Sequence, residues 1–202
     1  SGLLAPEENH TYVFAHLTLQ EHCAGCYIAQ DTEDPVGLVF QHRGEDRWRE
    51  PIFLGMGLAQ PAVLNSLLTD LVAREEDGQP KQRERWYRDL ILAAELGADR
   101  DWDYLRSRPM VKVAALQAAL RAGFAELLRD TTNPLPVGER IQVGDLLGTL
   151  GDPRFPTTID DWQAEWTRRN EHFGAPAGYW CYVQPGTYRI GGWDNNQEAA
   201  NI

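Results

Sequence analysis

Two cysteines three positions apart are the residues of this chain whose types and spacing most directly suggest chemistry. They are the first and last residues of the motif Cys23-Ala-Gly-Cys26. A Cys-x-x-Cys pair can form a redox disulfide, or it can supply two of the four ligands of a zinc site. The zinc alternative needs two further ligands, but the chain has no second Cys-x-x-Cys and its third cysteine, Cys181, stands alone.

The residues around the two thiols favour a structural role. Apolar residues recur here with helical spacing, at Leu19, Cys23, Cys26, Tyr27 and Ile28. This spacing predicts an amphipathic helix with both cysteines on its apolar face. A redox pair is typical of an α/β unit, whereas this pair is expected one turn into a helix of a helical protein. We expect two buried structural thiols, and a small redox or zinc module using Cys23 and Cys26 is the alternative.

The other candidate binding motifs each lack residues that they require. The run Asp99-Arg-Asp101-Trp-Asp103 begins like an EF-hand calcium loop, but Tyr104 stands where that loop requires glycine. The glycines at 55 and 57 lack the residues of a phosphate-binding loop. We therefore predict helix caps and solvated faces for the aspartates. For the chain as a whole we predict no catalytic residue, no cofactor, no metal and no enzyme activity.

The elements that position these residues are expected to be mostly helices. Tyr12-Val13-Phe14 predicts a short strand, and the next helix is expected to begin at Thr18. Thr18 and Glu21 have the spacing of a capping box, in which each side chain accepts a hydrogen bond from the other residue's backbone amide.

Apolar periodicity predicts further helices along the chain. A proline at position 61 suits the first turn of one of them, which is expected to end with Gly78 as its C-cap, before a polar linker at 79–84. The other predicted helices cover 48–60, 86–96 (closed by Gly97), 110–128 and 137–150, with a short helix or turn at 101–105. The fold class predicted is mainly α, an irregular helical bundle or a short α-solenoid, with a small β segment at the C-terminus.

The composition of the sequence changes after residue 151. Turn-forming residues lead into a Trp-rich, charged connector at 157–178. Aromatic and β-branched residues then predict two short strands at 179–183 and 186–190, while the polar last ten residues are expected to close no element.

Composition limits the classes of function. The 202 residues carry a formal net charge of −11 and 43% apolar residues. An acidic chain without a basic patch argues against nucleic-acid binding. No apolar run reaches the length of a membrane span, and the N-terminus lacks the features of a secretory signal. An odd number of cysteines favours the reducing cytoplasm, and the missing initiator Met suggests either a processed chain or an expressed fragment.

One stretch resembles a specific protein family. The pattern Tyr-x-Phe-x-His-Leu-Thr-Leu-Gln-Glu-x-x-Ala-Gly runs from residue 12 to residue 25. It is similar to the segment that closes the winged-helix part of NACHT-type (STAND) signalling NTPases. The residues that carry the resemblance are Phe14, His16, Thr18, Gln20 and Glu21. The resemblance implies that the chain is the helical region that follows such an ATPase.

A second resemblance covers the C-terminal end. Asp152, Pro153 and Arg154 belong to a stretch that resembles the connector before a formylglycine-generating-enzyme-like (sulfatase-modifying-factor) domain. Residues 180–192 are similar to the opening strands of that C-type-lectin-like domain, although Ile190 stands where the family often has Met. The chain would then hold only the first strands of that domain.

Together the resemblances imply four segments and an interaction role. Residues 1–31 would end the winged-helix-like region, 32–156 form the helical bundle or solenoid, 157–178 the connector, and 179–202 the incomplete domain. The function implied is a non-catalytic scaffold or sensor-coupling segment of a bacterial signalling or defence NTPase. Its partners would be the adjoining domains, or a protein partner or processing protease, with neither nucleic acid nor membrane. The residues expected at the interdomain contact are Trp162, Trp166, Trp180 and Tyr188.

An enzyme is the other alternative. The chain would then be a fragment of a formylglycine-generating enzyme whose catalytic residues lie elsewhere, because the position of Cys181 does not match the family's late catalytic cysteines.

Overall fold

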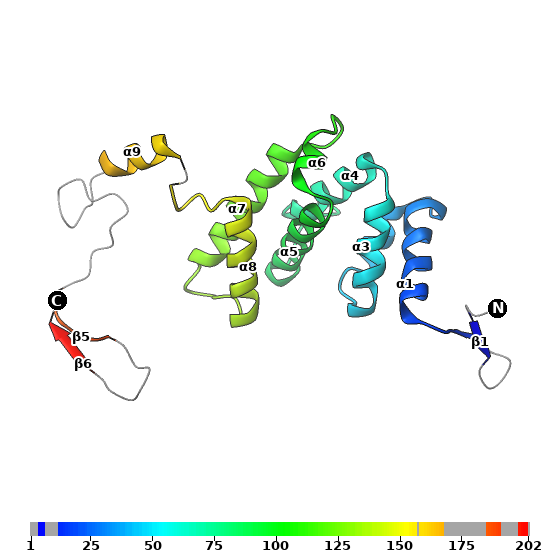
Figure 1. Ribbon diagram of the computed structural model, residues 1–202, viewed down its shortest axis with the longest axis horizontal. Helices are drawn as coiled ribbons and strands as arrows, with labels where there is room; N and C mark the ends of the chain where they lie inside the picture. Colours follow the sequence, from blue (N-terminus) through cyan, green and yellow to red (C-terminus); the bar gives the residue numbers. More distant parts are fainter. Residues whose placement is uncertain (1–3, 7–11, 157, 168–184, 191–197, 202) are drawn as a thin grey trace. The chain divides into compact units, whose positions relative to one another are not determined.

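The computed structural model describes residues 4–6, 12–156, 158–167, 185–190 and 198–201. In these residues the protein is mainly helical, and its β structure consists of short two-stranded sheets (Figure 1). The predicted fold class is therefore confirmed. The chain divides into two compact units, Ser1–Asp152 and Pro153–Ile202.

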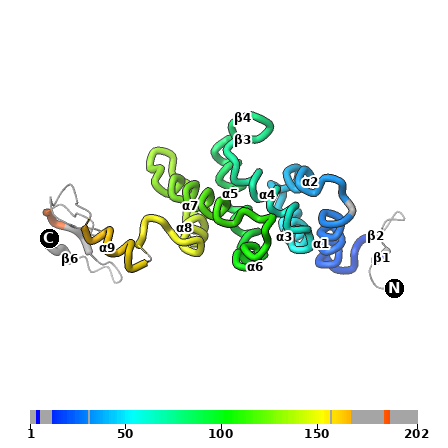
Figure 2. The backbone as a smooth tube through the Cα atoms, turned by 90° about the horizontal axis from the view of Figure 1, so that it is seen from above, coloured from blue at the N-terminus to red at the C-terminus, as the bar shows by residue number. Residues whose placement is uncertain are grey.

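Helices follow one another along the first unit, as Figure 2 shows from above. Their order, with the short strands between them, is β1 (Leu4–Pro6), β2 (Tyr12–Phe14), α1 (Leu17–Cys26), η2 (Tyr27–Asp31), α2 (Pro35–His42), η3 (Asp46–Trp48), α3 (Arg49–Leu58), α4 (Pro61–Val72), β3 (Glu75–Glu76), β4 (Gln79–Pro80), α5 (Arg83–Asp99), α6 (Trp102–Arg106), α7 (Val113–Arg129) and α8 (Val137–Leu150). The main packing pairs are α1 with α3, α4 with α5, α5 with α7, and α7 with α8. Packing of near neighbours in sequence is typical of a short α-solenoid.

The core of this unit lies along the inner faces of its helices. Helix α4 shows the pattern most clearly, because Leu64, Leu67, Leu68 and Leu71 are all fully buried. These positions follow the spacing i, i+3, i+4 and i+7, so they share one face of the helix. Pro61 begins α4 as predicted.

The start of α1 differs from the prediction. The N-cap is His16, with extended backbone, and no side chain makes a capping hydrogen bond there. Thr18 lies exposed inside the first turn, because the helix begins at Leu17. The predicted capping box of Thr18 and Glu21 is therefore wrong. The predicted strand at 12–14 is confirmed as β2, which pairs with β1 in antiparallel register.

Two glycines let α1 and α3 approach closely. A Cβ on Gly25 would lie 2.8 Å from Leu54 Cβ, and a Cβ on Gly55 would lie 2.9 Å from Ile28 Cβ. Real Cβ atoms do not pack at such distances, so each helix needs glycine where the other crosses it. The glycine inside Cys23-Ala-Gly-Cys26 is thus a packing residue.

The segment after α4 is a hairpin rather than a helix cap and linker. Asp77 and Gly78 both have positive φ, of 53° and 72°, and β3 pairs with β4 on either side of them. An Asp-Gly pair with positive φ at both positions is typical of the tight turn that joins two antiparallel strands. The predictions of Gly78 as a C-cap and of a linker over 79–84 are therefore wrong.

Helix α5 continues past its predicted end. Gly97 lies inside the helix, and a Cβ on it would overlap the indole of Trp102, so this glycine makes room for α6 rather than stopping α5. The segment at 101–105 is helical and is capped by Asp101, whose carboxylate accepts a hydrogen bond from the Asp103 amide at 2.9 Å. This is the capping role expected for one of the three aspartates.

The second unit contains α9 (Ile159–Thr167), β5 (Thr187–Ile190) and β6 (Glu198–Asn201). Thr158 and Asp161 form a reciprocal capping box at the start of α9, with hydrogen bonds of 3.1 and 3.2 Å. The strand predicted at 186–190 is confirmed as β5. Its partner is β6, so the prediction that the last ten residues close no element is wrong. The strand predicted at 179–183 lies outside the described residues.

Candidate functional site

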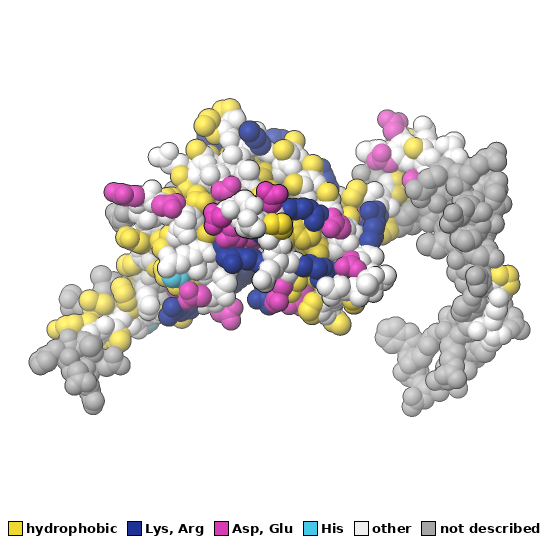
Figure 3. All heavy atoms as spheres, turned by 180° about the vertical axis from the view of Figure 1, so that it is seen from behind, with side chains coloured by type: hydrophobic (Ala, Val, Ile, Leu, Met, Phe, Trp, Pro, Cys, Tyr) yellow, Lys and Arg dark blue, Asp and Glu magenta, His cyan; other side chains and the backbone are white. Residues whose placement is uncertain are grey.

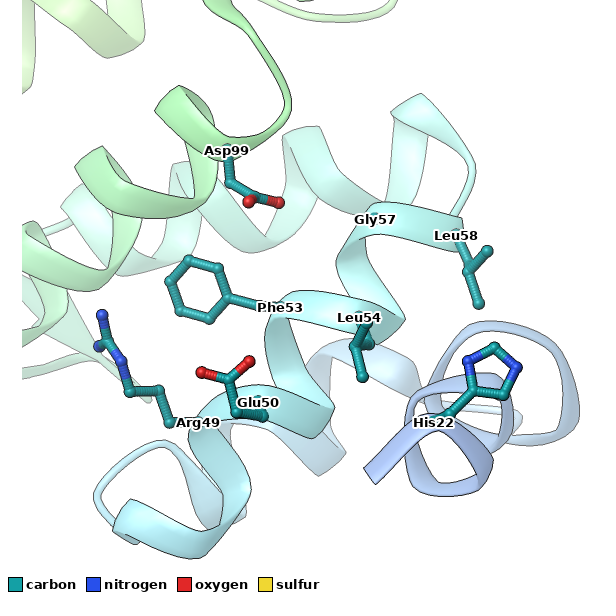
Figure 4. Close-up of a pocket in the computed structure, with 8 residues that line it drawn as sticks. All are labelled: His22, Arg49, Glu50, Phe53, Leu54, Gly57, Leu58 and Asp99. Atoms are coloured by element: carbon teal, nitrogen blue, oxygen red, sulfur yellow. The ribbon is translucent and has the colours of Figure 1, made fainter. Parts of the chain in front are cut away.

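A hollow of about 420 Å³ lies beside α1 and α3 and reaches the C-terminal end of α5. Its lining is His22, Arg49, Glu50, Phe53, Leu54, Gly57, Leu58 and Asp99. Figure 4 shows Glu50 and Asp99 on either side of Phe53, with His22 at the other end of the hollow near Leu54 and Leu58. The hollow therefore combines an imidazole, two carboxylates and an apolar surface.

Helix α3 supplies most of this lining and is fixed in place at both ends. Arg49 donates to Glu95 of α5 at 3.1 Å, and its guanidinium lies 4.9 Å from the centre of the Phe53 ring. Near the other end of α3, Arg100 donates to the carbonyl oxygen of Gly57. These contacts hold α3 against α5, so the position of Phe53 depends on both helices.

The cysteine pair does not lie in the core. Cys23 is exposed and Cys26 is half-buried, and both are free thiols. The prediction of two buried thiols on an apolar face is wrong, because the face of α1 that packs on α3 centres on Gly25 instead. The thiol of Cys26 has a partner, since its Sγ lies 3.5 Å from Nε2 of the exposed His22.

A buried ionic cluster, formed by Arg43, Asp89, Lys81 and Glu76, joins α2, α5 and the β3–β4 hairpin. Asp89 is only 2% exposed. It accepts from Arg43 Nε at 2.7 Å, and Lys81 Nζ lies 2.8 Å from its other oxygen. Arg43 also pairs with Glu76 of the hairpin at 2.7 Å. With two cations on one buried carboxylate, the cluster holds three segments together and offers no unpaired group for catalysis.

The acidic hairpin borders a second hollow, of about 490 Å³. Glu75, Glu76 and Asp77 line it together with Asp34 and Asp70, and the apolar residues Val36 and Phe40 complete the lining with Gly37. Within the described part of the chain, no three histidine, cysteine or acidic side chains are grouped closely enough to hold a metal ion. The hollow is therefore acidic without forming a metal centre of that kind.

The residues of the first family motif lie together on β2 and α1. Phe14, His16, Thr18 and Gln20 are exposed and Glu21 is half-buried. Gln20 and Glu21 line a small hollow of about 280 Å³ with Arg47 and Trp48.

The residues of the second motif lie where the two units divide. Asp152 is half-buried at the end of the first unit, and Pro153 and Arg154 are exposed at the start of the second.

Three of the four residues predicted at the interdomain contact lie in the described part of the chain. Trp162 and Trp166 lie one turn apart on α9 and are 47% and 77% exposed. Tyr188 pairs with Ala200 in the β5–β6 ladder. Trp180 lies outside the described residues.

The sequence reasoning missed the ionic cluster and most of the hollow beside α3. One signal for the cluster was present, because Asp89 interrupts the strongly apolar run between Trp86 and Leu96. A charged residue at a buried helical position is rarely left unpaired. Its partners Arg43 and Lys81 lie in other elements, so only the fold identifies them.

Comparisons with protein-family models, with curated proteins and with solved structures find no match to this chain. In the described residues, none of the helices is both long enough and apolar enough to span a membrane.

Proposed function

We propose that this chain is a non-catalytic helical scaffold that couples neighbouring domains of a multidomain signalling or defence NTPase in the cytoplasm. The observation that supports the proposal is the exposure of large apolar side chains in β2, at the start of α1 and in α9. Tyr12 and Leu17 are 68% and 66% exposed, and Ile159 and Trp166 are 76% and 77% exposed.

The N-terminal group has the character of a contact surface. All three residues of β2 have exposed apolar side chains, and Leu17, at the start of α1, follows the strand by three positions. Figure 3 shows hydrophobic side chains gathered on this N-terminal part, at the left of the view. A two-stranded hairpin has little stability alone and gains it by packing against another surface. Full burial of an exposed Leu or Phe side chain contributes about 1.5–3 kcal/mol, and each of these partly exposed side chains would contribute a share of that.

The tryptophans of α9 support the same role. Large aromatic side chains dominate the binding energy of many interfaces, and Trp162 and Trp166 share one side of α9. Exposed aromatic residues on α9 are therefore the expected contact with the following domain.

The first test is the intact mass of the native polypeptide, captured from the source cells with an antibody against this segment. The proposal predicts a mass several times the 22.8 kDa of this chain. Amide hydrogen exchange then compares the native polypeptide with the isolated chain. We expect slower exchange at 12–17 and 159–166 in the native polypeptide. A native product of 22.8 kDa from a short reading frame, or equal exchange in both samples, would contradict the proposal.

Variants locate the contact. Leu17→Gln and Trp166→Ala should each raise exchange at their own segment in the native polypeptide. Met110→Gln is the matched control, because Met110 is 63% exposed and, in the sequence, lies between α6 and α7, outside both segments. An equal response of all three variants would count against specific interdomain contacts.

A further inference from the structure

We propose that His22 and Cys26 form a binding site for a thiophilic divalent cation, with zinc as the best match, at the edge of the hollow beside α3. The site does not depend on the proposed scaffold function. It departs from the prediction that the chain holds no metal, and from the zinc alternative that paired Cys23 with Cys26.

The distance between the two ligand atoms fits a tetrahedral metal ion. Cys26 Sγ and His22 Nε2 lie 3.5 Å apart. In tetrahedral zinc sites the Zn–S bond is about 2.3 Å and the Zn–N bond about 2.0–2.1 Å, which places the two ligand atoms about 3.5–3.6 Å apart. The separation of Sγ and Nε2 therefore matches that of two ligands on one tetrahedral ion.

Helix α1 presents the two side chains on one face. His22 and Cys26 are four positions apart, and residues at this spacing are neighbours on a helix surface. The backbone that carries them is fixed, because Gly25 packs directly against Leu54 and Gly55 of α3. Binding a metal then requires little ordering of the chain, and this lowers its entropic cost.

The pair is also accessible and chemically suited. His22 is exposed and Cys26 is half-buried, so solvent ions reach both. Thiolate and imidazole together favour Zn²⁺ over hard cations such as Mg²⁺ and Ca²⁺, which take oxygen ligands. In the described part of the chain no third ligand joins the pair, so the remaining coordination positions are left for water or for a donor from a partner.

Cys23 provides the internal control. It is exposed on the same helix, but it stands next to His22 in sequence and so points about 100° away from it. The proposal assigns it no role in binding. A Cys-x-x-Cys site would instead need Cys23 as much as Cys26.

The test is a titration of the reduced full chain with Co²⁺, followed by displacement with Zn²⁺. A thiolate bound to Co²⁺ gives a near-ultraviolet charge-transfer band, which we expect in the wild type and which Zn²⁺ should abolish. Cys26→Ser should lose the band, and His22→Gln should weaken binding, because it removes one of the two protein ligands. Cys23→Ser and Cys181→Ser should keep both band and affinity. Far-ultraviolet circular dichroism confirms that each variant remains helical.

Any of four results would overturn the proposal. The wild type could show no thiolate–Co²⁺ band, the band could survive in Cys26→Ser, or His22→Gln could bind as tightly as the wild type. Equal losses in Cys23→Ser and Cys26→Ser would also reject the His22–Cys26 pair, in favour of a Cys-x-x-Cys site.

Discussion

At the scale of single residues, Asp89 shows how a buried charge can organise a surface segment. Lys81, whose side chain is fully buried, contacts Asp89 and also donates to the carbonyl oxygens of Asp70 and Leu71 at 2.8 and 3.1 Å. A cation at the C-terminal end of α4 is favourable for the helix dipole. Asp89 thus fixes the side chain that joins the end of α4 to the hairpin.

The Asp89→Asn variant should lower the free energy of unfolding by about 3–5 kcal/mol, because it leaves the buried cations Arg43 and Lys81 without their shared carboxylate. Urea denaturation measures the change. The matched control is Glu84→Gln on the same helix, which removes an exposed ion pair with Arg88 and should cost less than about 0.5 kcal/mol. Similar losses in the two variants would mean that burial of the cluster does not matter for stability.

At this scale the sequence predicts the local setting of a residue better than it predicts the residues that contact it. It places Asp89 in an apolar helical run, but Arg43 is 46 positions away and belongs to another element. The thiols illustrate the same limit. Helical spacing groups Cys23 with the apolar residues, whereas the approach of α3 makes Gly25 the buried residue of that motif.

At the scale of elements, glycines set how closely α1 and α3 approach. Gly55→Ala should destabilise the protein by about 1–3 kcal/mol, because the new methyl group would collide with Ile28. Gly57→Ala on the same helix meets nothing within 4 Å, and it should stabilise the helix by about 0.5–1 kcal/mol. Thermal or urea unfolding of both variants separates packing from helix propensity. If both alanines raise stability, the close crossing of the two helices is wrong.

The turn between α7 and α8 depends on a carboxylate. Hydrogen bonds from the backbone amides of Asn133 and Thr132, with the nearby Arg83, hold the pKa of Asp130 below its ordinary value. A lowered folded-state pKa means that this stabilisation is present above the unfolded pKa, about 3.9, and is lost as pH falls through the folded value.

Asp130→Asn should therefore unfold at lower urea concentration than the wild type near pH 7, because it keeps an amide oxygen for the turn but loses the charge. The gap between their midpoints should shrink as the pH falls below about 4. Urea titrations at several pH values measure it. A gap that stays constant with pH would show that the charge of Asp130 contributes nothing.

Periodicity explains why helices are predictable here and helix ends are not. The apolar spacing of Leu64, Leu67 and Leu71 predicts α4, because these side chains form the buried face that packs on α5. The ends depend on local turn geometry or on another element. Asp77-Gly78 closes a hairpin rather than a helix, and Gly97 makes room for Trp102.

At the scale of the whole molecule, the first unit is built from helices that pack mainly on near neighbours in sequence. Helix α5 is the central element, because it packs on α4, α7 and α8 and also contacts α3 and α6. The sequence indicates this kind of architecture by its succession of helices with short polar breaks. It does not indicate which faces meet, since the contacts depend on particular residues such as Gly123, whose missing side chain leaves room for Leu90 and Trp86 of α5.

Because the helices pack mainly on near neighbours, a destabilising substitution at one end of the unit should accelerate amide hydrogen exchange mainly near that end. Leu147 is fully buried on α8, so Leu147→Ala should cost about 2–5 kcal/mol by leaving a cavity. In a repeat-like array, stability is approximately a sum of local units and the interfaces between neighbours. Amide hydrogen exchange should therefore accelerate most in α7 and α8, less in α5, and least in α1 and α3. Gly55→Ala should give the reverse gradient, which makes it the matched control from the other end. Uniform acceleration along the unit by both variants would instead indicate one cooperative globular core, and the solenoid description would fail.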